Sequence, residues 1–529
     1  MEKREDWRSI LPYLPVVMRS SSLFWPSQVV GALRELGCGR VDSGQLLFIF
    51  ITELRNSLSL SSEPLAPSAA HGYALFFDEL ISREECRKWF EEVLPSLGDL
   101  LLRLPSLLEA HYENADMVID GKGATVRTGL RMLDSQEAGI VFLTQELIAA
   151  LLACSFLCLF PVHDRYEKQL QPVNFDELFA SLYNDYTQKQ EDKIWCIIHY
   201  FQRITSNMPK GVVSFERKVL PWEDDCIHIS YPNASFWSTS VKPLCRFEVK
   251  SSGLIEDHSS ETVEVDFANE YLGGGALRRG CVQEEIRFMI SPELIAGMIF
   301  LPSMADNEAI DIVGVERFSS YTGYASSFRF SGDYVDDKEV DPFGRRKTRI
   351  VAIDALCGPG MRQYREKFLL REINKAFCGF LQQSQYQRDQ KIPQENFDAM
   401  ETSEGKYSYQ EIRNSQNDYD MMENSNDIGV ATGNWGCGAF GGDPEVKTII
   451  QWLAASQAGR PFIAYYTFGS GALQNLDKVS CWILSQGWTV GDLWNMLVEY
   501  STSRSKGETN VGFLQWLLPS IYDHDSGMY

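Results

Sequence analysis

The spacing of apolar residues gives the first half of the chain, residues 1–205, a mainly helical pattern. In residues 86–97 apolar side chains recur at intervals of three and four, directly after Ser82-Arg83-Glu84-Glu85, which has the spacing of a capping box. Pro95 and Pro105 predict breaks or bends in the helices that follow. No candidate chemistry stands out in this half, so a scaffold role is expected.

Residues 139–160 form the most apolar stretch and have two possible interpretations. A membrane span needs about 20 apolar residues. Gln145 and Glu146 interrupt this stretch and leave about 14 apolar-rich residues, a length that fits a buried helix. We therefore expect a buried helix, and no association with a membrane.

From about Gly211 the pattern changes to short apolar runs separated by helical segments. The run 462–468 is almost continuously apolar and ends at a glycine, which is typical of a strand buried on both faces. Strands that alternate with helices predict an α/β domain. The expected strands are residues 212–215, 262–266, 350–353 and 462–468, and the expected helices include residues 364–381 and 445–458.

Two polar segments interrupt this pattern. Residues 383–426 are rich in Gln, Asn, Asp, Glu, Ser and Tyr and have few aliphatic residues, which predicts a mobile insertion. Residues 332–347 contain an acidic run followed by Arg345-Arg346-Lys347 and are expected to be exposed. The basic triplet has two readings, a nuclear import signal or part of a solvated loop, and the location stays open between nucleus and cytoplasm.

Charge and cysteine usage narrow the class of protein. The 529 residues include 72 acidic and 49 basic side chains, a formal net charge of -23. General nucleic-acid binding needs many Lys and Arg residues that neutralise phosphates, so direct DNA binding is not expected. The 12 cysteines form no C-x-x-C pair and the seven histidines are dispersed, which predicts no zinc site. We expect neither a metal nor a cofactor.

The candidate chemistry lies in three motifs within 21 residues. Val265-Asp266-Phe267-Ala268-Asn269 is followed by Gly273-Gly274-Gly275 and then by Gln283-Glu284-Glu285, which opens an apolar segment expected to be a helix. A triple glycine lets backbone N–H groups approach a ligand closely, although the same glycines could simply form a tight turn. Neither the Rossmann nor the Walker A glycine spacing is present.

A second glycine-rich loop, residues 433–443, precedes another helical segment. Its N–H groups are expected to be free for contact with an anion. Two such loops in one α/β domain suit a diphosphate that is held from two sides.

The carboxylate pair has a common structural explanation as well as a catalytic one. Two Glu residues at a helix start often only interact with the helix dipole. Adjacent helical residues point about 100° apart, so only one of Glu284 and Glu285 can face a scissile bond directly. Like charge raises the proton affinity of one member, while the helix N-terminus and nearby N–H groups lower it.

Together these motifs resemble the signature of the poly(ADP-ribose) glycohydrolase family, over residues 255–468. The resemblance implies hydrolysis of ribose–ribose O-glycosidic bonds in poly(ADP-ribose), with Glu285 as the acid/base. It implies that Glu284 positions the ribose hydroxyls at the cleaved bond and that Asp266 belongs to the catalytic group. Cys281 and Cys437 lie in the motif loops, but no His is near either in the sequence, so a thiolate nucleophile is not expected.

The resemblance also implies a set of substrate-binding residues. Tyr324 matches a tyrosine that stacks on adenine, and Ile255-Glu256 matches a pair that contacts adenine. On sequence alone, an aromatic residue is more often part of a core than of a ligand site. The remaining substrate-binding positions are Asn269, Gln283, the three glycines Gly273, Gly274 and Gly275, the loop residues Asn434, Trp435, Gly436, Cys437, Gly438, Ala439 and Phe440, and Phe468.

The expected fold is α/β: a macrodomain-like mixed sheet flanked by helices, with an N-terminal all-helical accessory domain. The accessory domain is expected over residues 1–205 and the catalytic domain over residues 206–529, with residues 383–426 as an insertion. Because the folded pattern starts near the N-terminus, the chain looks most like plant-type members of the family.

The expected partners are poly(ADP-ribose) and proteins that carry it, with ADP-ribose as product, in the DNA damage response. A net charge of -23 opposes long-range attraction of this polyanion, so local N–H groups and stacking would have to bind it. One alternative is a macrodomain that reads ADP-ribose without cleaving it, and another is an inactive family member acting as a scaffold. Gln283-Glu284-Glu285 favours the enzyme, since a reader needs no carboxylate at the glycosidic bond.

Overall fold

The structure is a computed structural model that describes residues 4, 6–19, 22–36, 39–116, 126–222, 230–258, 261–381 and 428–523. The chain forms two compact units. The first comprises Met1–Ala115, Arg127–Tyr231 and Glu264–Gly358, and the second comprises mainly Pro232–Val263 and Pro359–Tyr529. Each unit combines segments that are distant in sequence.

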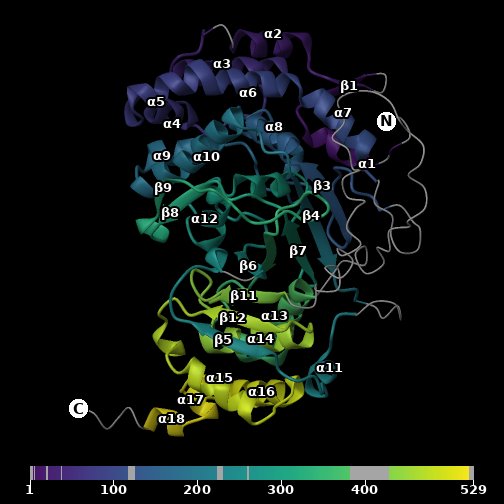
Figure 1. Cartoon of the computed structure of the whole chain (residues 1–529), viewed down its shortest axis with the longest axis vertical. Helices are drawn as coiled ribbons and strands as arrows, with labels where there is room; N and C mark the ends of the chain where they lie inside the picture. The colour runs from purple at the N-terminus through teal and green to yellow at the C-terminus, as the bar shows by residue number, and fades with distance from the viewer. Residues whose placement is uncertain are drawn as a thin grey trace. The chain divides into compact units, whose positions relative to one another are not determined.

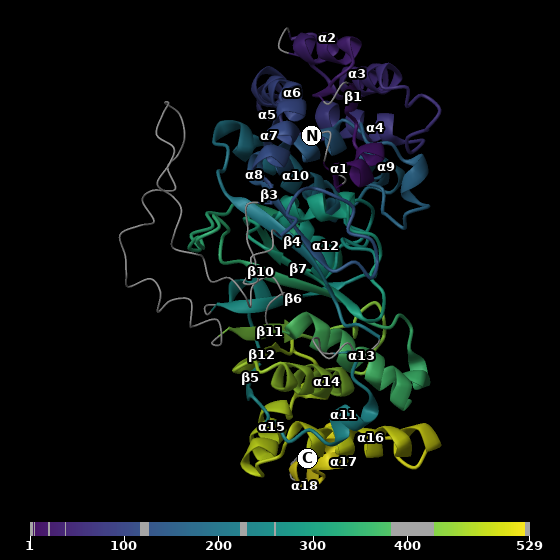
Figure 2. The same ribbon diagram turned by 90° about the vertical axis from the view of Figure 1, so that its right-hand side faces the viewer.

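In the first unit, helices are layered on a sheet. Figures 1 and 2 show α2, α3 and α6 farthest from the sheet that contains β3, β4 and β7, with α8 and α10 between them and that sheet. Its helices are α1 (Asp6–Ile10), α2 (Ser27–Leu36), α3 (Gly44–Ser57), α4 (Ala69–Ala74), α5 (Arg83–Lys88), α6 (Leu94–Leu102), α7 (Leu104–Asn114), α8 (Gln145–Phe156), α9 (Asp176–Asn184), α10 (Gln188–Ser206) and α12 (Gln283–Ile290).

Local sequence signals explain where several of these helices begin. The predicted capping box at Ser82 is confirmed: its hydroxyl accepts the Glu85 N–H, and the Glu85 carboxylate accepts the Ser82 N–H. Pro105 occupies the first turn of α7, where proline lacks only an N–H that has no helical partner anyway. Pro95 instead follows a π-helical turn, Trp89–Val93, which continues directly into α6. Thr144 caps α8 by accepting the Leu147 N–H at 3.2 Å.

The sheet of the first unit has the strand order β3-β4-β7-β10-β6. Strand β4 pairs antiparallel with β3 and β7, and β7 pairs antiparallel with β10. Two-stranded pairs β1-β2 and β8-β9 lie outside this sheet. The strands are β1 (Val17–Arg19), β2 (Ser22–Phe24), β3 (Gly139–Thr144), β4 (Val212–Val219), β6 (Thr262–Ala268), β7 (Glu308–Val313), β8 (Ser319–Thr322), β9 (Arg329–Asp333) and β10 (Arg349–Asp354).

Strand β3 corrects the expectation that residues 1–205 are all helical in character. The apolar run 139–160 is a strand, Gly139–Thr144, followed by the buried helix α8. Both elements are apolar because β3 packs in the sheet and α8 is buried on all sides, between the outer helices and the sheet. No helix in the described ranges is long and apolar enough to cross a bilayer.

The second unit has a parallel three-strand arrangement in the order β11-β12-β5. Helices α13 and α14 pack together beside these strands (Figure 2). Asp443 caps α14 and Pro444 occupies its first turn. The elements are β5 (Arg246–Lys250), β11 (Gly429–Gly433), β12 (Phe462–Tyr466), α11 (Ala234–Ser238), α13 (Glu366–Phe380), α14 (Pro444–Gln457), α15 (Leu476–Ser485), α16 (Val490–Lys506), α17 (Phe513–Leu517) and α18 (Ser520–Asp523).

The strands and helices predicted after Gly211 are confirmed within a few residues, whereas three other predictions have different outcomes. The insertion 383–426 lies outside the described residues, and the domain boundary at residues 205 and 206 stays a prediction. The segment 332–347 is less exposed than expected. Arg345 is only 4% exposed and pairs with Asp341, and Arg346 pairs with Glu316 at 3.0 Å, so most of the basic triplet is held within the fold.

Candidate active site

The side chain of Gln283, the first residue of helix α12, is hydrogen-bonded to the backbone of strand β6. Its Nε2 atom donates to the Val265 carbonyl at 3.1 Å, and its Oε1 atom accepts the Phe267 N–H at 2.8 Å. Both bonds run to the backbone of one strand, which fixes the start of the helix relative to β6. Asp266, between the two contacts, therefore lies beside the first turn of α12.

Glu284, in that first turn, is held by the backbone of the glycine loop. Its Oε1 atom accepts the Gly273 N–H at 2.7 Å and its Oε2 atom accepts the Asn269 N–H at 2.9 Å. The side chain is buried, at 2% exposure. These bonds fix both oxygens of the carboxyl group and leave it no freedom to rotate.

Glu285 is held in the same way by a different pair of N–H groups. Its Oε1 atom accepts the Gly275 N–H at 2.9 Å, and its Oε2 atom accepts the Val282 N–H at 2.8 Å. The second bond is the return half of a capping box, because Val282 is the cap of α12. At 7% exposure Glu285 is the more accessible of the two glutamates.

The triple glycine therefore serves the glutamates of the protein itself. The Gly274 N–H donates to the Tyr271 carbonyl at 3.0 Å, so all three glycine N–H groups are engaged. Gly274 has a positive φ of 48°, and an added Cβ would lie 2.6 Å from Glu284 Oε2 and 2.8 Å from Glu285 Oε1. Only glycine permits this backbone to approach two carboxyl groups so closely. Contact of these glycines with a substrate stays a prediction.

Asp266 completes a cluster of three buried carboxyl groups. It is 1% exposed, and neither of its oxygens has a hydrogen-bond partner in the described ranges. Burial, followed by the charge of Glu285, raises its pKa to about 8. Burial and the charges of Asp266 and Glu285 also raise the pKa of Glu284 well above its usual value, although two backbone N–H groups oppose this. The cluster therefore holds protons at neutral pH, a common property of catalytic sites.

Tyr324 lies at the turn of the β8-β9 hairpin, next to the start of α12. Burial raises the pKa of its hydroxyl, the neighbouring backbone of Gln283 lowers it, and the charge of Glu285 raises it further. The residue as a whole is 54% exposed, unusually high for a large aromatic side chain. Its ring is available to stack on a ligand, close to the start of the helix that carries both glutamates.

A thiolate nucleophile remains unsupported. Cys281 precedes α12 by two residues, but it is buried, and burial raises the pKa of its thiol despite the nearby charge of Lys193. Burial likewise raises the pKa of Cys437. Over the described ranges, no group of three or more His, Cys, Asp or Glu side chains has the arrangement of a metal site.

In the second unit, the predicted substrate residues gather at one edge of the strands. Strands β5, β12 and β11 are parallel, with Lys250 opposite Tyr466 and Tyr466 opposite Gly433. The segments that follow their carboxyl ends carry Ile255 and Glu256, Phe468, and the loop 434–442. Ligands of open α/β sheets commonly bind at this edge of the strands.

The loop after β11 is closed by its own hydrogen bonds. The Gly442 N–H donates to the Gly436 carbonyl at 2.9 Å, and the Cys437 N–H donates to the Asn434 carbonyl at 3.0 Å. The Asn434 amide donates to the Thr467 carbonyl at 3.1 Å, which joins this loop to the segment after β12. Trp435 is fully buried, with Lys447 over its ring, and is not available for stacking on a ligand.

Phe468 and Ile255 differ in what they offer a ligand. Phe468 is 48% exposed and has a positive φ of 48°, an unfavourable conformation for an aromatic residue and one that is frequent at functional sites. Ile255 is buried, at the start of the short 3-10 helix Ile255–Asp257. Glu256 is half-buried beside it.

The comparisons with known proteins agree with these motifs. A family model described as poly(ADP-ribose) glycohydrolase, Macro domain fold, matches residues 234–475, and a model of the helical domain of the same family matches residues 81–217. Poly(ADP-ribose) glycohydrolase 1 of Arabidopsis thaliana is 56% identical over 561 residues, covering 98% of each chain. The chain belongs to the poly(ADP-ribose) glycohydrolase family. This confirms the predicted family, the plant-type resemblance and the expected fold class.

Two further relatives show how sequence identity varies within the family. The probable poly(ADP-ribose) glycohydrolase 2 of Arabidopsis thaliana is 55% identical over 525 residues, with 98% of this chain and 100% of the relative covered. Poly(ADP-ribose) glycohydrolase 1 of Caenorhabditis elegans is 32% identical over 319 residues, with 58% of this chain and 35% of the relative covered. The expected enzyme class, a glycosidase, is confirmed with the family.

One contribution to the glycohydrolase site was not predicted from the sequence. Lys193 and Gln190, on α10, hold the segment between the glycine loop and α12. The Lys193 Nζ atom donates to the carbonyls of Arg278 at 2.7 Å and Gly280 at 2.6 Å, and Gln190 Nε2 donates to Arg278 at 2.9 Å. Lys193 is completely buried, and burial lowers its pKa to about 8. The sequence did contain one signal for this role: Lys193 lies among the apolar positions of α10. A lysine there is expected to be buried, and a fully buried lysine is rare unless its charge has a partner.

Proposed function

We propose that this chain hydrolyses ribose–ribose O-glycosidic bonds in poly(ADP-ribose) and thereby releases ADP-ribose from modified proteins. The observation that carries the proposal is the cluster of Asp266, Glu284 and Glu285, whose two glutamates are oriented by four backbone N–H groups. A protein that only binds ADP-ribose has no use for three buried carboxyl groups at one helix start, because burying them costs free energy of folding.

Glu285 is the proposed acid/base. It is the most exposed member of the cluster, and its carboxyl group is fixed by N–H groups on both sides. In the forward step Glu285 gives a proton to the departing ribose oxygen as the C–O bond breaks through an oxocarbenium-like state. The carboxylate that results then takes a proton from the attacking water, so that Glu285 regains its proton and the product carries the hydroxyl.

Asp266 affects that step through its protonation state, and Glu284 affects it by positioning the substrate. With its raised pKa, Asp266 stays largely protonated at neutral pH and adds little repulsion against Glu285. Glu284, fixed by Gly273 and Asn269, is assigned to the ribose hydroxyls on the resemblance of its motif. This division of work differs from glycosidases in which a second carboxylate acts as nucleophile or as separate base.

The substrate contacts are assigned to residues with exposed faces. Tyr324 and Phe468 each expose about half of the residue, and both are proposed to stack on parts of ADP-ribose. The loop 434–440 and Ile255-Glu256, at the carboxyl edge of β5, β12 and β11, are proposed to bind the rest of the nucleotide. With a net charge of -23, the chain is proposed to act without direct contact to DNA or membranes, in the nucleus or the cytoplasm.

The decisive experiment measures ADP-ribose released from purified poly(ADP-ribose) by the native chain and by Glu285→Gln. The matched control is Glu85→Gln, because Glu85 is also the second Glu of a Glu-Glu pair and closes a capping box at the start of α5. Both variants change the same kind of helix cap from a carboxylate to an amide, but only one loses the proposed acid/base. A parallel assay with a chelator tests for a dependence on metal ions.

The two candidate functions give different results. We expect Glu285→Gln to release ADP-ribose at least about a thousandfold more slowly while it still binds ADP-ribose, and Glu85→Gln to keep native activity. If the native chain binds ADP-ribose and releases none from the polymer, the non-catalytic reader is the correct function. If Glu285→Gln stays active, another group is the acid/base.

A further inference from the structure

Tyr324 depends on a hairpin that has little support of its own. Among the strands that the structure describes, β8 and β9 pair only with each other, and their register shifts between Ser319 and Tyr321. An isolated two-stranded hairpin is marginally stable in water. The position of Tyr324, at the turn between the two strands, must therefore be set by contacts with other elements.

One face of helix α10 supplies these contacts. Asp192, Trp195, His199 and Arg203 are spaced three or four residues apart and so lie along one side of the helix. The Trp195 ring stacks on the Phe330 ring with centroids 6.3 Å apart, and Asp192 Oδ2 lies 3.9 Å from Arg329 Nε. These contacts fix the half of β9 that is nearer to Tyr324.

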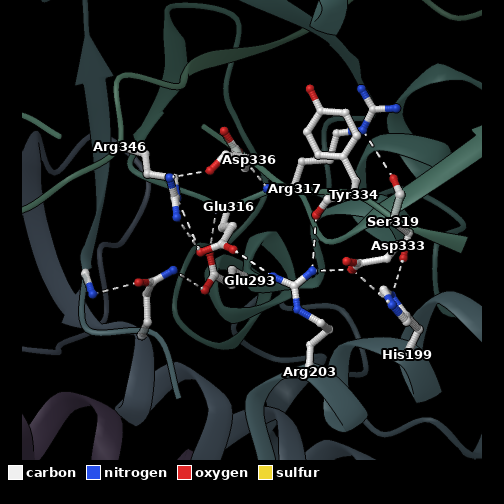
Figure 3. Close-up of polar contacts among 12 residues, drawn as sticks. His199, Arg203, Glu293, Glu316, Arg317, Ser319, Asp333, Tyr334, Asp336 and Arg346 are labelled. Carbon is white, nitrogen blue, oxygen red and sulfur yellow. Dashed lines mark hydrogen bonds and ion pairs between the residues drawn. The ribbon is translucent and has the colours of Figure 1, made fainter. Parts of the chain in front are cut away.

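His199 closes the open end of the hairpin. Its Nδ1 atom lies 3.1 Å from Ser319 Oγ, and its Nε2 atom lies 3.3 Å from Asp333 Oδ1 (Figure 3). Ser319 and Asp333 are opposite each other in the register of β8 and β9. One imidazole ring thus holds the first residue of β8 and the last residue of β9 together.

Arg203, one turn farther along α10, ties the same end to the body of the unit. Its guanidinium group pairs with Asp333, donates to the Tyr334 carbonyl at 3.1 Å and lies 3.3 Å from Glu316 Oε1. Figure 3 shows this guanidinium group between Glu316 and Asp333.

The Glu316 end of this network is itself fixed in the interior. The Glu316 N–H donates to Glu293 Oε2 at 2.8 Å, Gln145 Nε2 donates to Glu293 Oε1 at 2.8 Å, and Arg346 holds the Glu316 carboxylate. Glu293 and Gln145 are both buried. The contacts of Arg203 therefore end on a rigid part of the molecule and not on another loop.

We propose that His199 and Arg203 are positioning residues for Tyr324, because they clamp the open end of the β8-β9 hairpin. The inference rests on the proposed function, in which Tyr324 stacks on the substrate. Breaking the clamp lets the hairpin move and weakens substrate binding. The chemistry at Glu285 stays intact, because α12 is held separately by Gln283 on β6 and by its capping box.

The test compares Arg203→Met and Asp333→Asn with the matched control Arg40→Gln. Asp333 is half-exposed, so its variant is expected to fold even if the loss of Arg203 proves disruptive. Arg40 forms an exposed ion pair with Glu35, remote in sequence from the hairpin, and its loss should have little effect. Amide hydrogen exchange of the free proteins reports on residues 319–334, and steady-state kinetics on poly(ADP-ribose) gives KM and kcat.

We expect faster exchange in residues 319–334 and a KM roughly five- to tenfold higher in both clamp variants, with kcat within about twofold of native. In a Tyr324→Ala background the same substitutions should raise KM no further, since their effect passes through Tyr324. If hydrogen exchange in residues 319–334 is unchanged in both clamp variants, the proposed clamp is wrong, regardless of the kinetic results. Faster exchange with an unchanged KM, or additive effects with Tyr324→Ala, overturns the link to the substrate. If the native chain itself releases no ADP-ribose, the proposed function fails instead.

Discussion

The α-carbon of Gly280 lies directly against the carboxyl group of Glu285. A Cβ added to Gly280 would lie 2.7 Å from both the carboxyl carbon and the Oε1 atom of Glu285. The backbone of Gly280 does not have a positive φ, so this glycine is required for space and not for backbone conformation. The position of the proposed acid/base therefore depends on the absence of a single methyl group.

Gly280→Ala is expected to displace the Glu285 carboxyl group and to lower kcat about a hundredfold, with a much smaller effect on KM. A misplacement of about 1 Å is enough for a loss of this size. Single-turnover release of ADP-ribose from poly(ADP-ribose) measures the chemical step. The matched control is Gly31→Ala in α2, where an added Cβ meets nothing within 4 Å, and it should keep native activity. Native kcat in Gly280→Ala would mean that Glu285 tolerates the shift or is not the acid/base.

Lys193→Met is expected to lower kcat about tenfold and to destabilise the fold by about 1–3 kcal/mol. The substitution removes both hydrogen bonds from Lys193 and leaves the Gly280 carbonyl without this donor, so the segment that leads to α12 loosens. Urea unfolding and steady-state kinetics measure the two effects. Lys189→Met, four residues earlier on the same helix, is the matched control. An equal loss of kcat and stability in both variants would show that the loss of a positive charge matters, and not the loss of the hydrogen bonds from Lys193 to Arg278 and Gly280.

Arg217 on β4 and Glu308 on β7 form a completely buried ion pair in the first unit. Removing one partner leaves the other charge buried and unpaired, which costs about 3–5 kcal/mol. Arg217→Met should lower the free energy of unfolding by that amount, measured by urea denaturation. Arg103→Gln, which breaks the solvent-exposed pair with Glu146, should change it by less than about 1 kcal/mol. Similar values for the two variants would contradict the importance of burial.

Much of the fold was predictable because its signals are local. The capping box at Ser82, the start of α12 at Gln283 and the buried strand β12 all follow from the spacing of residues close in sequence. Strand β3 was missed because its short apolar run, Ile140 to Leu143, is compatible with either a strand or a buried helix. Its identity depends on pairing with β4, which the sequence of β3 does not contain.

The candidate site was predictable in its residues but not in its geometry. The motifs identify Asp266, Glu284 and Glu285 as a group, yet the N–H groups of the triple glycine bind these glutamates and not a ligand. Lys193 was missed because its contacts reach residues 85 and 87 positions away in the sequence. Contacts of this kind depend on how α10 packs, and local patterns carry no information about that.

The stability of the fold is expected to fall with rising pH because of Asp266. A free aspartate has a pKa of about 4, whereas burial and the charge of Glu285 raise the pKa of Asp266 to about 8. Between these values the folded chain binds more protons than the unfolded chain, so the free energy of unfolding decreases as pH rises from about 4 to about 8.

In Asp266→Asn this contribution is absent. The urea midpoint of the variant, relative to native, should therefore increase from pH 5 to pH 8, while activity falls. Asp99→Asn, at an exposed position on α6, should show a constant difference. A constant difference for Asp266→Asn as well would mean that Asp266 is already charged at pH 5.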